Sequence, residues 1–237
     1  MKSLEILDTL RRSDKPVFTL SDISKLVGKP RTQTKIILHR LMKRKLITRI
    51  ERGKYYLDAH PFAVSSNITF PSYISFLTAL NYYELTTQIS KIIFIATNKF
   101  KKSLTLENYA VEFIKINKDR FFGYKRERFH GKFLFIGDVE KVILDSLYLP
   151  QYCPIAETFE AVKSKTFDLD KLVSYAVRMN SSVVAKRLGY MLDISGVDIY
   201  DRIKNKITKK FDLLNPKLPK KKNKHKKWKL IVNEVLE

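Results

Sequence analysis

The hydrophobic pattern of residues 19–57 changes along the segment from a helical period to a strand composition. Two stretches carry apolar side chains three or four positions apart, which is typical of amphipathic helices. Gly28 and Pro30 separate them and predict a turn, because proline fits the first turn of a new helix but cannot continue the preceding one. Two strand-like stretches follow, and Gly53 between them predicts a hairpin turn. The helical stretches are residues 20–27 and 31–46, and the strand-like stretches are residues 47–50 and 54–57.

A first helix is predicted in residues 3–12, where apolar side chains recur on one face. A short strand or extended link then leads to Thr19, which can cap the second helix together with Asp22 three residues later. Three helices followed by a two-stranded ribbon are the elements of a winged helix-turn-helix, which we expect to occupy residues 1–60. The apolar face of the first helix comprises Leu4, Ile6, Leu7 and Leu10.

Residues 61–237 are predicted to form a second, larger domain, because the pattern changes at His60-Pro61. Strands and helices alternate in residues 61–153, whereas residues 154–237 are mainly helical and end in a hairpin. The predicted fold class is α+β, with an N-terminal winged helix followed by a mixed α/β domain with a helical C-terminal part. The predicted helices are residues 71–85, a helix capped by Asp138 that ends before Pro150, and residues 156–163, 169–179, 182–193 and 199–207. The predicted strands are residues 91–97, 108–116, 131–136, 211–214 and 228–232, with a solvated turn at residues 121–128.

The second helix of the predicted helix-turn-helix pair has one apolar face and one polar, basic face. Short polar side chains in the first turn of such a helix can reach base edges, and longer basic side chains reach bases or phosphates. The tip of the ribbon carries further basic residues, where a wing contacts phosphates or the minor groove. The predicted DNA-binding residues are Arg31, Thr32, Gln33, Lys35 and Arg40 on the helix, and Arg49, Arg52 and Lys54 on the wing.

The net charge of +22 favours a polyanionic partner whose binding depends steeply on salt. Residues 1–60 hold 15 Lys/Arg against six Asp/Glu, and residues 217–229 hold eight lysines and no acidic residue. The lysine-rich segment is either a disordered tail or the loop of an ordered hairpin, and the apolar run after Trp228 favours the hairpin. A solvated, lysine-rich surface without a partner is the simplest alternative. The predicted second basic patch comprises Lys220, Lys221, Lys222, Lys224, Lys226 and Lys227.

Residue types with catalytic or metal-binding chemistry show no known functional spacing. Cys153 is the only cysteine, which excludes an internal disulfide and a multi-cysteine zinc site, and the four histidines lie far apart. No nucleotide-binding glycine loop, serine elbow or His-Glu-x-x-His motif occurs. Asp138, Glu140 and Asp145 are close in sequence, but on a helix the first two point to different sides. We therefore expect no enzymatic activity, no metal and no cofactor.

A leucine-rich helix that leads into a wing with arginine, glycine and tyrosine occupies residues 38–57, LHRLMKRKLITRIERGKYYL. This segment resembles the winged-helix start of the AbiEi-type antitoxins. Shorter similarities follow in the same order, in PSYISFLTALNYYELT, IIFIATNK, FLFIGDVEKVILDSLYLPQYC, VAKRLGYMLDISG and WKLIVN, whereas the lysine-loaded loop before Trp228 departs from the family pattern. The resemblance implies repression of its own operon and neutralisation of a nucleotidyltransferase-type toxin encoded beside it.

The leading hypothesis from the sequence is therefore a DNA-binding antitoxin. Its partners would be double-stranded operator DNA and the cognate nucleotidyltransferase-like toxin, and we expect a monomer or weak homodimer. Two alternatives stay open: an ordinary winged-helix transcription regulator with a ligand-sensing C-terminal domain, and a nuclease targeted to DNA. The chain has no run of about 18 apolar residues, and its first 15 residues are charged rather than those of a signal peptide, which predicts a cytoplasmic protein without a membrane partner.

Overall fold

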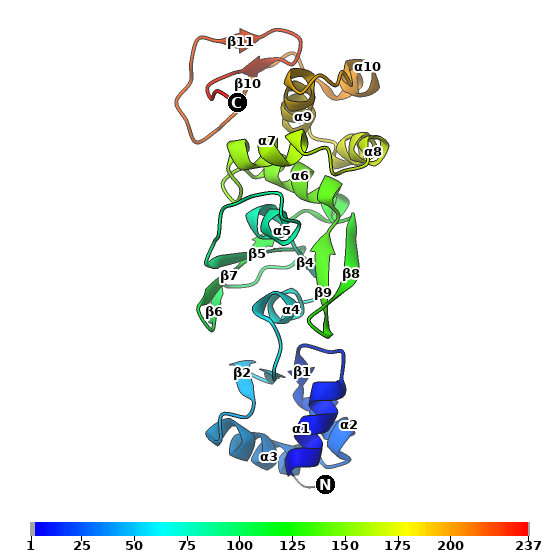
Figure 1. The fold of residues 1–237 in the computed structure, drawn as a ribbon, viewed down its shortest axis with the longest axis vertical. Helices are drawn as coiled ribbons and strands as arrows, with labels where there is room; N and C mark the ends of the chain where they lie inside the picture. Colours follow the sequence, from blue (N-terminus) through cyan, green and yellow to red (C-terminus); the bar gives the residue numbers. More distant parts are fainter. Residues whose placement is uncertain (1–2, 237) are drawn as a thin grey trace.

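The computed structural model describes residues 3–236, with side chains from residue 5 onward. Figure 1 shows three parts along the long axis: a helical unit with a small sheet at one end, a larger sheet in the middle, and helices with another small sheet at the other end. The predicted position of the Leu4 side chain lies outside the described residues. The arrangement confirms the predicted α+β class with an N-terminal winged helix.

The winged helix forms because its caps and apolar faces agree with one another. The Thr19 hydroxyl accepts a hydrogen bond from the Asp22 amide, and the Asp22 carboxylate accepts one from the Thr19 amide, which caps α2. Gly28 ends α2 in the left-handed conformation, with a φ of 65°. Phe18, Ile23 and their neighbours form a core separate from that of the rest of the chain. The elements are α1 Ser3–Arg12, β1 Phe18–Thr19, α2 Leu20–Val27, α3 Arg31–Lys43, β2 Thr48–Glu51 and β3 Lys54–Tyr56, in the sheet order β1-β3-β2.

A mixed sheet of six strands forms the middle of the molecule, in the order β6-β7-β5-β4-β9-β8. β5 is antiparallel to β4 and parallel to β7, and its residues 93–97 are buried, as its continuous apolar run predicts. The elements are α4 Pro61–Ser66, β4 Ser72–Ile74, α5 Phe76–Tyr82, β5 Ile92–Thr97, β6 Leu104–Leu106, β7 Tyr109–Lys115, the 3-10 helix η1 Lys118–Arg120, β8 Tyr124–Phe129 and β9 Lys132–Gly137.

Two predicted assignments in this sheet are wrong. Tyr73 lies in strand β4 rather than in a helix that begins at Pro71, because residues 72–74 pair with β5, and Ile74 also pairs with β9. The segment 124–129 forms strand β8 rather than a solvated turn, because it pairs along its whole length with β9. Charged side chains on β8 are largely exposed, and they hide the strand pattern in the sequence.

α6 is the central helix of the layer beyond the sheet, where it packs against α5, α7, α8 and α9. Asp138 precedes α6 as predicted, but its carboxylate does not cap the helix. It accepts a hydrogen bond from the Tyr175 hydroxyl and pairs with Lys171 instead. None of the described helices is long and apolar enough to cross a membrane. The elements are α6 Val139–Tyr148, α7 Ile155–Lys163, α8 Leu169–Met179, α9 Ser182–Ile194, α10 Tyr200–Ile203 and the 3-10 helix η2 Lys204–Lys206.

The C-terminal segment folds onto α9 as a small sheet of strands β10 Asp212–Leu213, β11 Lys224–His225 and β12 Leu230–Ile231. β12 lies between the other two, parallel to β10 and antiparallel to β11. The predicted hairpin between residues 211–214 and 228–232 is therefore wrong, since the strands in those segments run in the same direction. Trp228 is fully buried, and its indole Nε1 donates to Asp193 at 3.1 Å. The lysine-rich segment is thus a loop held at both ends.

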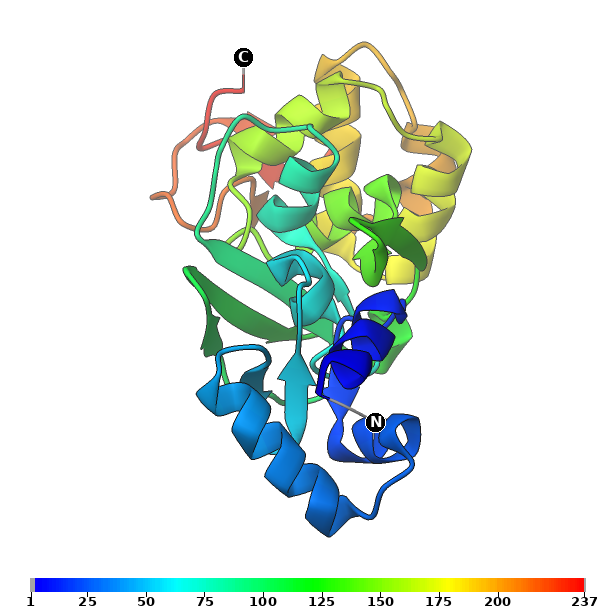
Figure 2. The same ribbon diagram turned by 60° about the horizontal axis from the view of Figure 1, so that its bottom comes forward.

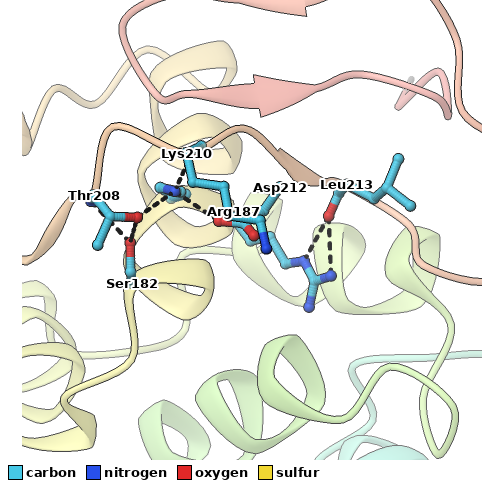
Figure 3. A network of polar contacts seen from close by, with 7 residues as sticks. Ser182, Arg187, Thr208, Lys210, Asp212 and Leu213 are labelled. Carbon is cyan, nitrogen blue, oxygen red and sulfur yellow. Dashed lines mark hydrogen bonds and ion pairs between the residues drawn. The ribbon is translucent and has the colours of Figure 1, made fainter.

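Two buried cations of α9 hold strand β10 in place (Figure 3). Lys186 Nζ pairs with the Asp212 carboxylate at 2.6 Å and donates to the Lys210 carbonyl, also at 2.6 Å. Arg187 donates from Nε and Nη2 to the Leu213 carbonyl, at 3.2 and 3.0 Å. Burial lowers the pKa of Arg187 to about 10. Such charge-assisted hydrogen bonds are strong in a dry interior, so the base of the lysine-rich loop is fixed to α9.

Cys153 is expected to resist thiol reagents in the folded protein. Its side chain is fully buried, and burial raises the pKa of the thiol to about 11. Because the thiolate is the reactive form, an aromatic disulfide reagent at pH 7 should react at least about 100-fold more slowly with native protein than with protein in guanidinium chloride. Equal rates in the two conditions would contradict the burial of this side chain.

Candidate nucleic-acid interface

α3 lies at the end of the molecule farthest from the C-terminal sheet (Figures 1 and 2). Its side chains Thr34, Leu38 and Leu41 are buried, so the opposite side of the helix points outward. The structure brings the predicted helix residues together on this exposed side. The exposed residues are Arg31, Thr32, Gln33, Lys35 and Arg40.

Two hydrogen bonds fix the first turn of α3. The Thr34 hydroxyl donates to the Pro30 carbonyl at 3.0 Å, and Arg31 Nη2 lies 3.4 Å from the Ser21 hydroxyl oxygen on α2. Ile36, which is not among the predicted site residues, lies on the same side with 55% of its surface exposed. An apolar side chain beside polar ones can contact a thymine methyl group in the major groove. The sequence could have indicated Ile36 as a site residue, because the helical period places it on the basic face of the helix.

The three remaining predicted residues lie on the wing, and they differ in their exposure. Arg49 and Arg52 are exposed. Lys54 is partly buried, pairs with Glu51 at 2.8 Å and donates to the Ile68 carbonyl. The Lys54 ammonium is therefore engaged at the contact between the wing and the rest of the protein. The two arginine side chains stay exposed, although Arg49 Nε donates to the Glu51 carbonyl at 3.3 Å.

The body, residues 61–236, holds the winged helix at α1 through the hairpin of β8 and β9. The buried Lys132 side chain lies at the C-terminal end of α1, where its Nζ donates to the carbonyl of Arg11 at 2.7 Å and to that of Ser13, just beyond the helix, at 2.6 Å. The Phe133 amide donates to the Asp14 carbonyl at 3.1 Å. A lysine at a helix C-terminus also interacts favourably with the helix dipole. The sequence could have indicated that Lys132 is buried. Side chains alternate between the two faces of a strand, and Lys132 shares its face with two buried apolar residues, Leu134 and Ile136.

The body also holds the wing from the opposite edge of the sheet. Lys101 pairs with Glu51 at 2.6 Å. The Tyr56 hydroxyl donates to the Glu107 carboxylate at 3.0 Å, and burial together with this hydrogen bond raises the pKa of Tyr56 to about 12. A polar cleft of about 280 Å³ lies between the wing and the turn that carries Glu107. The winged helix is thus fixed to the body on two sides rather than joined by one flexible linker.

The predicted second basic patch lies at the other end of the molecule (Figure 1). Lys227 does not belong to its free cations, because its ammonium pairs with Asp193 at 2.8 Å and with Asp198 at 3.0 Å. An open hollow of about 440 Å³ is lined by four of the lysines. The lining residues are Lys220, Lys221, Lys222 and Lys224, and Lys226 is also exposed.

The acidic residues near α6 contact lysines. Lys171 Nζ lies 3.1 Å from Asp138 and 3.0 Å from Glu140, so these two carboxylates share one cation. Asp145 is fully buried and pairs with Lys141, and it accepts hydrogen bonds from two further hydroxyl groups. Within residues 3–236, no group of three or more His, Cys, Asp or Glu side chains has the arrangement of a metal site. The carboxylates therefore act as partners for lysines in this fold.

Residues 5–57 match the model of a protein family described as transcriptional regulator, AbiEi antitoxin. The matched residues contain α1, α2, α3 and the wing. Over the winged helix, this match confirms the predicted resemblance to the AbiEi-type antitoxins, and it supports a DNA-binding antitoxin. A search of the curated proteins found no match.

Proposed function

We propose that this protein is an antitoxin that represses its own operon, with the exposed side of α3 in the major groove of operator DNA. The observation that carries the proposal is that five predicted contact residues share the exposed side of one helix in a segment that matches a transcriptional regulator family. Arg31, Lys35 and Arg40 supply positive charge, and Thr32 and Gln33 in the first turn are short enough to read base edges.

In this proposal the wing contacts the DNA backbone through Arg49 and Arg52. Both side chains are exposed, and arginine binds phosphate with two parallel hydrogen bonds. Lys54 supports the wing instead, since its ammonium is held by Glu51 and the Ile68 carbonyl. The DNA-binding surface is therefore smaller than the set of residues that the sequence predicts.

We assign neutralisation of the toxin to the body. The description of the matched family as antitoxin supports this assignment, and the resemblance of the downstream segments to AbiEi-type antitoxins points to a nucleotidyltransferase-type toxin. A binding role fits the acidic residues near α6, because lysines hold all three carboxylates. In this proposal residues 1–60 regulate and residues 61–237 neutralise, in a monomer or weak homodimer.

Replacement of Gln33 by alanine is expected to relax sequence preference and leave general DNA affinity nearly unchanged. Loss of a base-edge contact removes about 1–3 kcal/mol of discrimination at one base pair. The measurement is selection of bound duplexes from a random pool, followed by titration of the preferred and a scrambled duplex at fixed salt. An equal loss of affinity for both duplexes would contradict base reading by Gln33.

A further inference from the structure

The loop of residues 217–229, which we call the lysine loop, combines high charge with a fixed position. Its start is held by the Asn233 amide, which donates to the carbonyls of Asn215 at 2.7 Å and Leu218 at 3.1 Å. Its end is held by Trp228, buried against α9, and by the ion pairs of Lys227. A charged segment anchored in this way presents its cations at set positions, which a disordered tail does not.

The outer lysines of this loop are available to a partner. Across residues 3–236, no carboxylate lies within ion-pair distance of Lys220, Lys221, Lys222, Lys224 or Lys226, although 24 acidic residues occur in the whole chain. Four of these lysines surround one open hollow of about 440 Å³. Their mutual repulsion is relieved when an anion enters the hollow, so the site favours a ligand of high negative charge density.

The residue types of the loop favour nucleic-acid phosphates over an acidic protein. Protein–protein interfaces are depleted in lysine and enriched in aromatic residues and arginine, and the hollow is lined by lysines alone. Phosphate backbones carry closely spaced charges, and lysine binds them as a point charge with release of counterions. The ammonium nitrogens of Lys224 and Lys229 lie 5.4 and 5.5 Å from the centre of the Phe211 ring. This ring therefore packs against the cations rather than offering a free stacking surface.

The position of the loop determines what such a site does. The sheet and the helical layer separate the lysine loop from α3, which lies at the opposite end of the molecule (Figure 1). We propose that the lysine loop is a second binding site for the phosphate backbone of nucleic acid, and that one molecule thereby bridges two nucleic-acid segments. The bridging rests on the proposed DNA-binding function of α3, whereas the lysine-loop site does not.

The first experiment isolates the loop in the full-length chain. The background variant carries Arg31→Ala, Lys35→Ala and Arg40→Ala, which removes the helix contacts. Its binding to labelled 30-nucleotide duplex DNA, single-stranded DNA and RNA of one sequence is measured by anisotropy at several salt concentrations. Adding Lys220→Gln, Lys221→Gln and Lys222→Gln should weaken binding about tenfold or more and reduce the logarithmic salt slope by about 2–3. The three probes show which nucleic acid the site prefers.

A matched control separates position from total charge. Lys91, Lys115 and Lys118 are exposed lysines of the body, and their replacement by glutamine removes the same charge. This control should change affinity less than about twofold. An equal loss in both triple variants, or competition by poly-glutamate as strong as that by nucleic acid at equal charge concentration, would overturn the phosphate site.

The second experiment tests bridging with the otherwise unmodified protein. Duplex DNA is fixed to beads, protein is added, unbound protein is washed away, and the retention of a second, fluorescent nucleic acid is measured. Unmodified protein should retain the second probe, and the lysine-loop variant should lose at least about 80% of that retention while it stays on the beads. Retention unchanged in that variant overturns bridging. If the variant with Arg31→Ala, Lys35→Ala and Arg40→Ala bridged the two nucleic acids as well as the unmodified protein does, the function proposed for α3 would be refuted while the loop site would stand.

Discussion

Replacement of Arg31, Lys35 and Arg40 together by alanine is expected to weaken binding to operator DNA by about 100-fold or more and to abolish repression. All three side chains are exposed on one side of α3. Among the described residues, the long hydrogen bond of Arg31 to Ser21 is the only side-chain hydrogen bond or ion pair that they form. Each lost contact to a base or phosphate costs about 1–3 kcal/mol, and three lost phosphate contacts reduce the logarithmic salt slope by about 2.7. Titration of labelled duplex at several salt concentrations measures both quantities.

The same variant is expected to protect cells from the toxin as well as the unmodified protein does. In our proposal neutralisation belongs to the body, whereas the three substitutions lie in α3, near one end of the molecule (Figure 1). Growth after induction of the toxin, with the antitoxin expressed from an independent promoter, measures protection. The control with Lys91, Lys115 and Lys118 replaced keeps α3 intact at equal charge. Loss of protection together with repression would show that the two functions are not divided in this way.

Replacement of Gly189 by alanine is expected to destabilise the protein by about 1–3 kcal/mol, because it overpacks the site of Trp228. In an ordinary helix the same change is stabilising by about 1 kcal/mol, since alanine is the better helix former. A methyl group on Gly189 would lie only 2.0 Å from Cζ3 of the Trp228 ring, so the indole must move. Trp228 is the only tryptophan, and its fluorescence during urea unfolding reports on this contact directly.

A double-mutant cycle separates this clash from other effects of the glycine substitution. With Trp228 replaced by leucine the ring is gone, and Gly189→Ala should then be neutral or stabilising when unfolding is followed by circular dichroism. A similar loss of stability in both backgrounds would mean that the ring is not the cause. The clash also links stability to the lysine loop, because Trp228 is the last residue but one of that loop and anchors it on α9.

Local signals in the sequence were sufficient for the winged helix. The pair Thr19 and Asp22 forms the predicted cap, and Gly28 and Pro30 place the turn before α3 as predicted. The helix period of α3 also separates its buried residues from its exposed ones, because the helix has a core on one side and solvent on the other. Each of these features depends on residues within one or two turns of one another.

The sequence failed where distant segments decide the structure. Tyr73 belongs to a three-residue strand buried between β5 and β9, and such a short apolar run has no period that separates a strand from a helix. The parallel pairing of β10 with β12 depends on hydrogen bonds from Lys186 and Arg187 to residues 210–213. These partners lie more than 20 positions apart in the sequence. Lys54 has the sequence context of a wing cation, and only the position of the Ile68 carbonyl shows that it is engaged elsewhere.

The attachment of the winged helix to the body through Lys132 and Lys101 has a consequence for genetics. These two lysines contribute to holding the winged helix, and with it α3, on the body, although neither belongs to α3 or the wing. A screen for derepressed operons should therefore return substitutions at both positions, alongside substitutions in α3 itself. Such mutations would affect the contacts that hold the winged helix on the body rather than the proposed DNA-binding surface. Their suppressors should map to Glu51 and the end of α1.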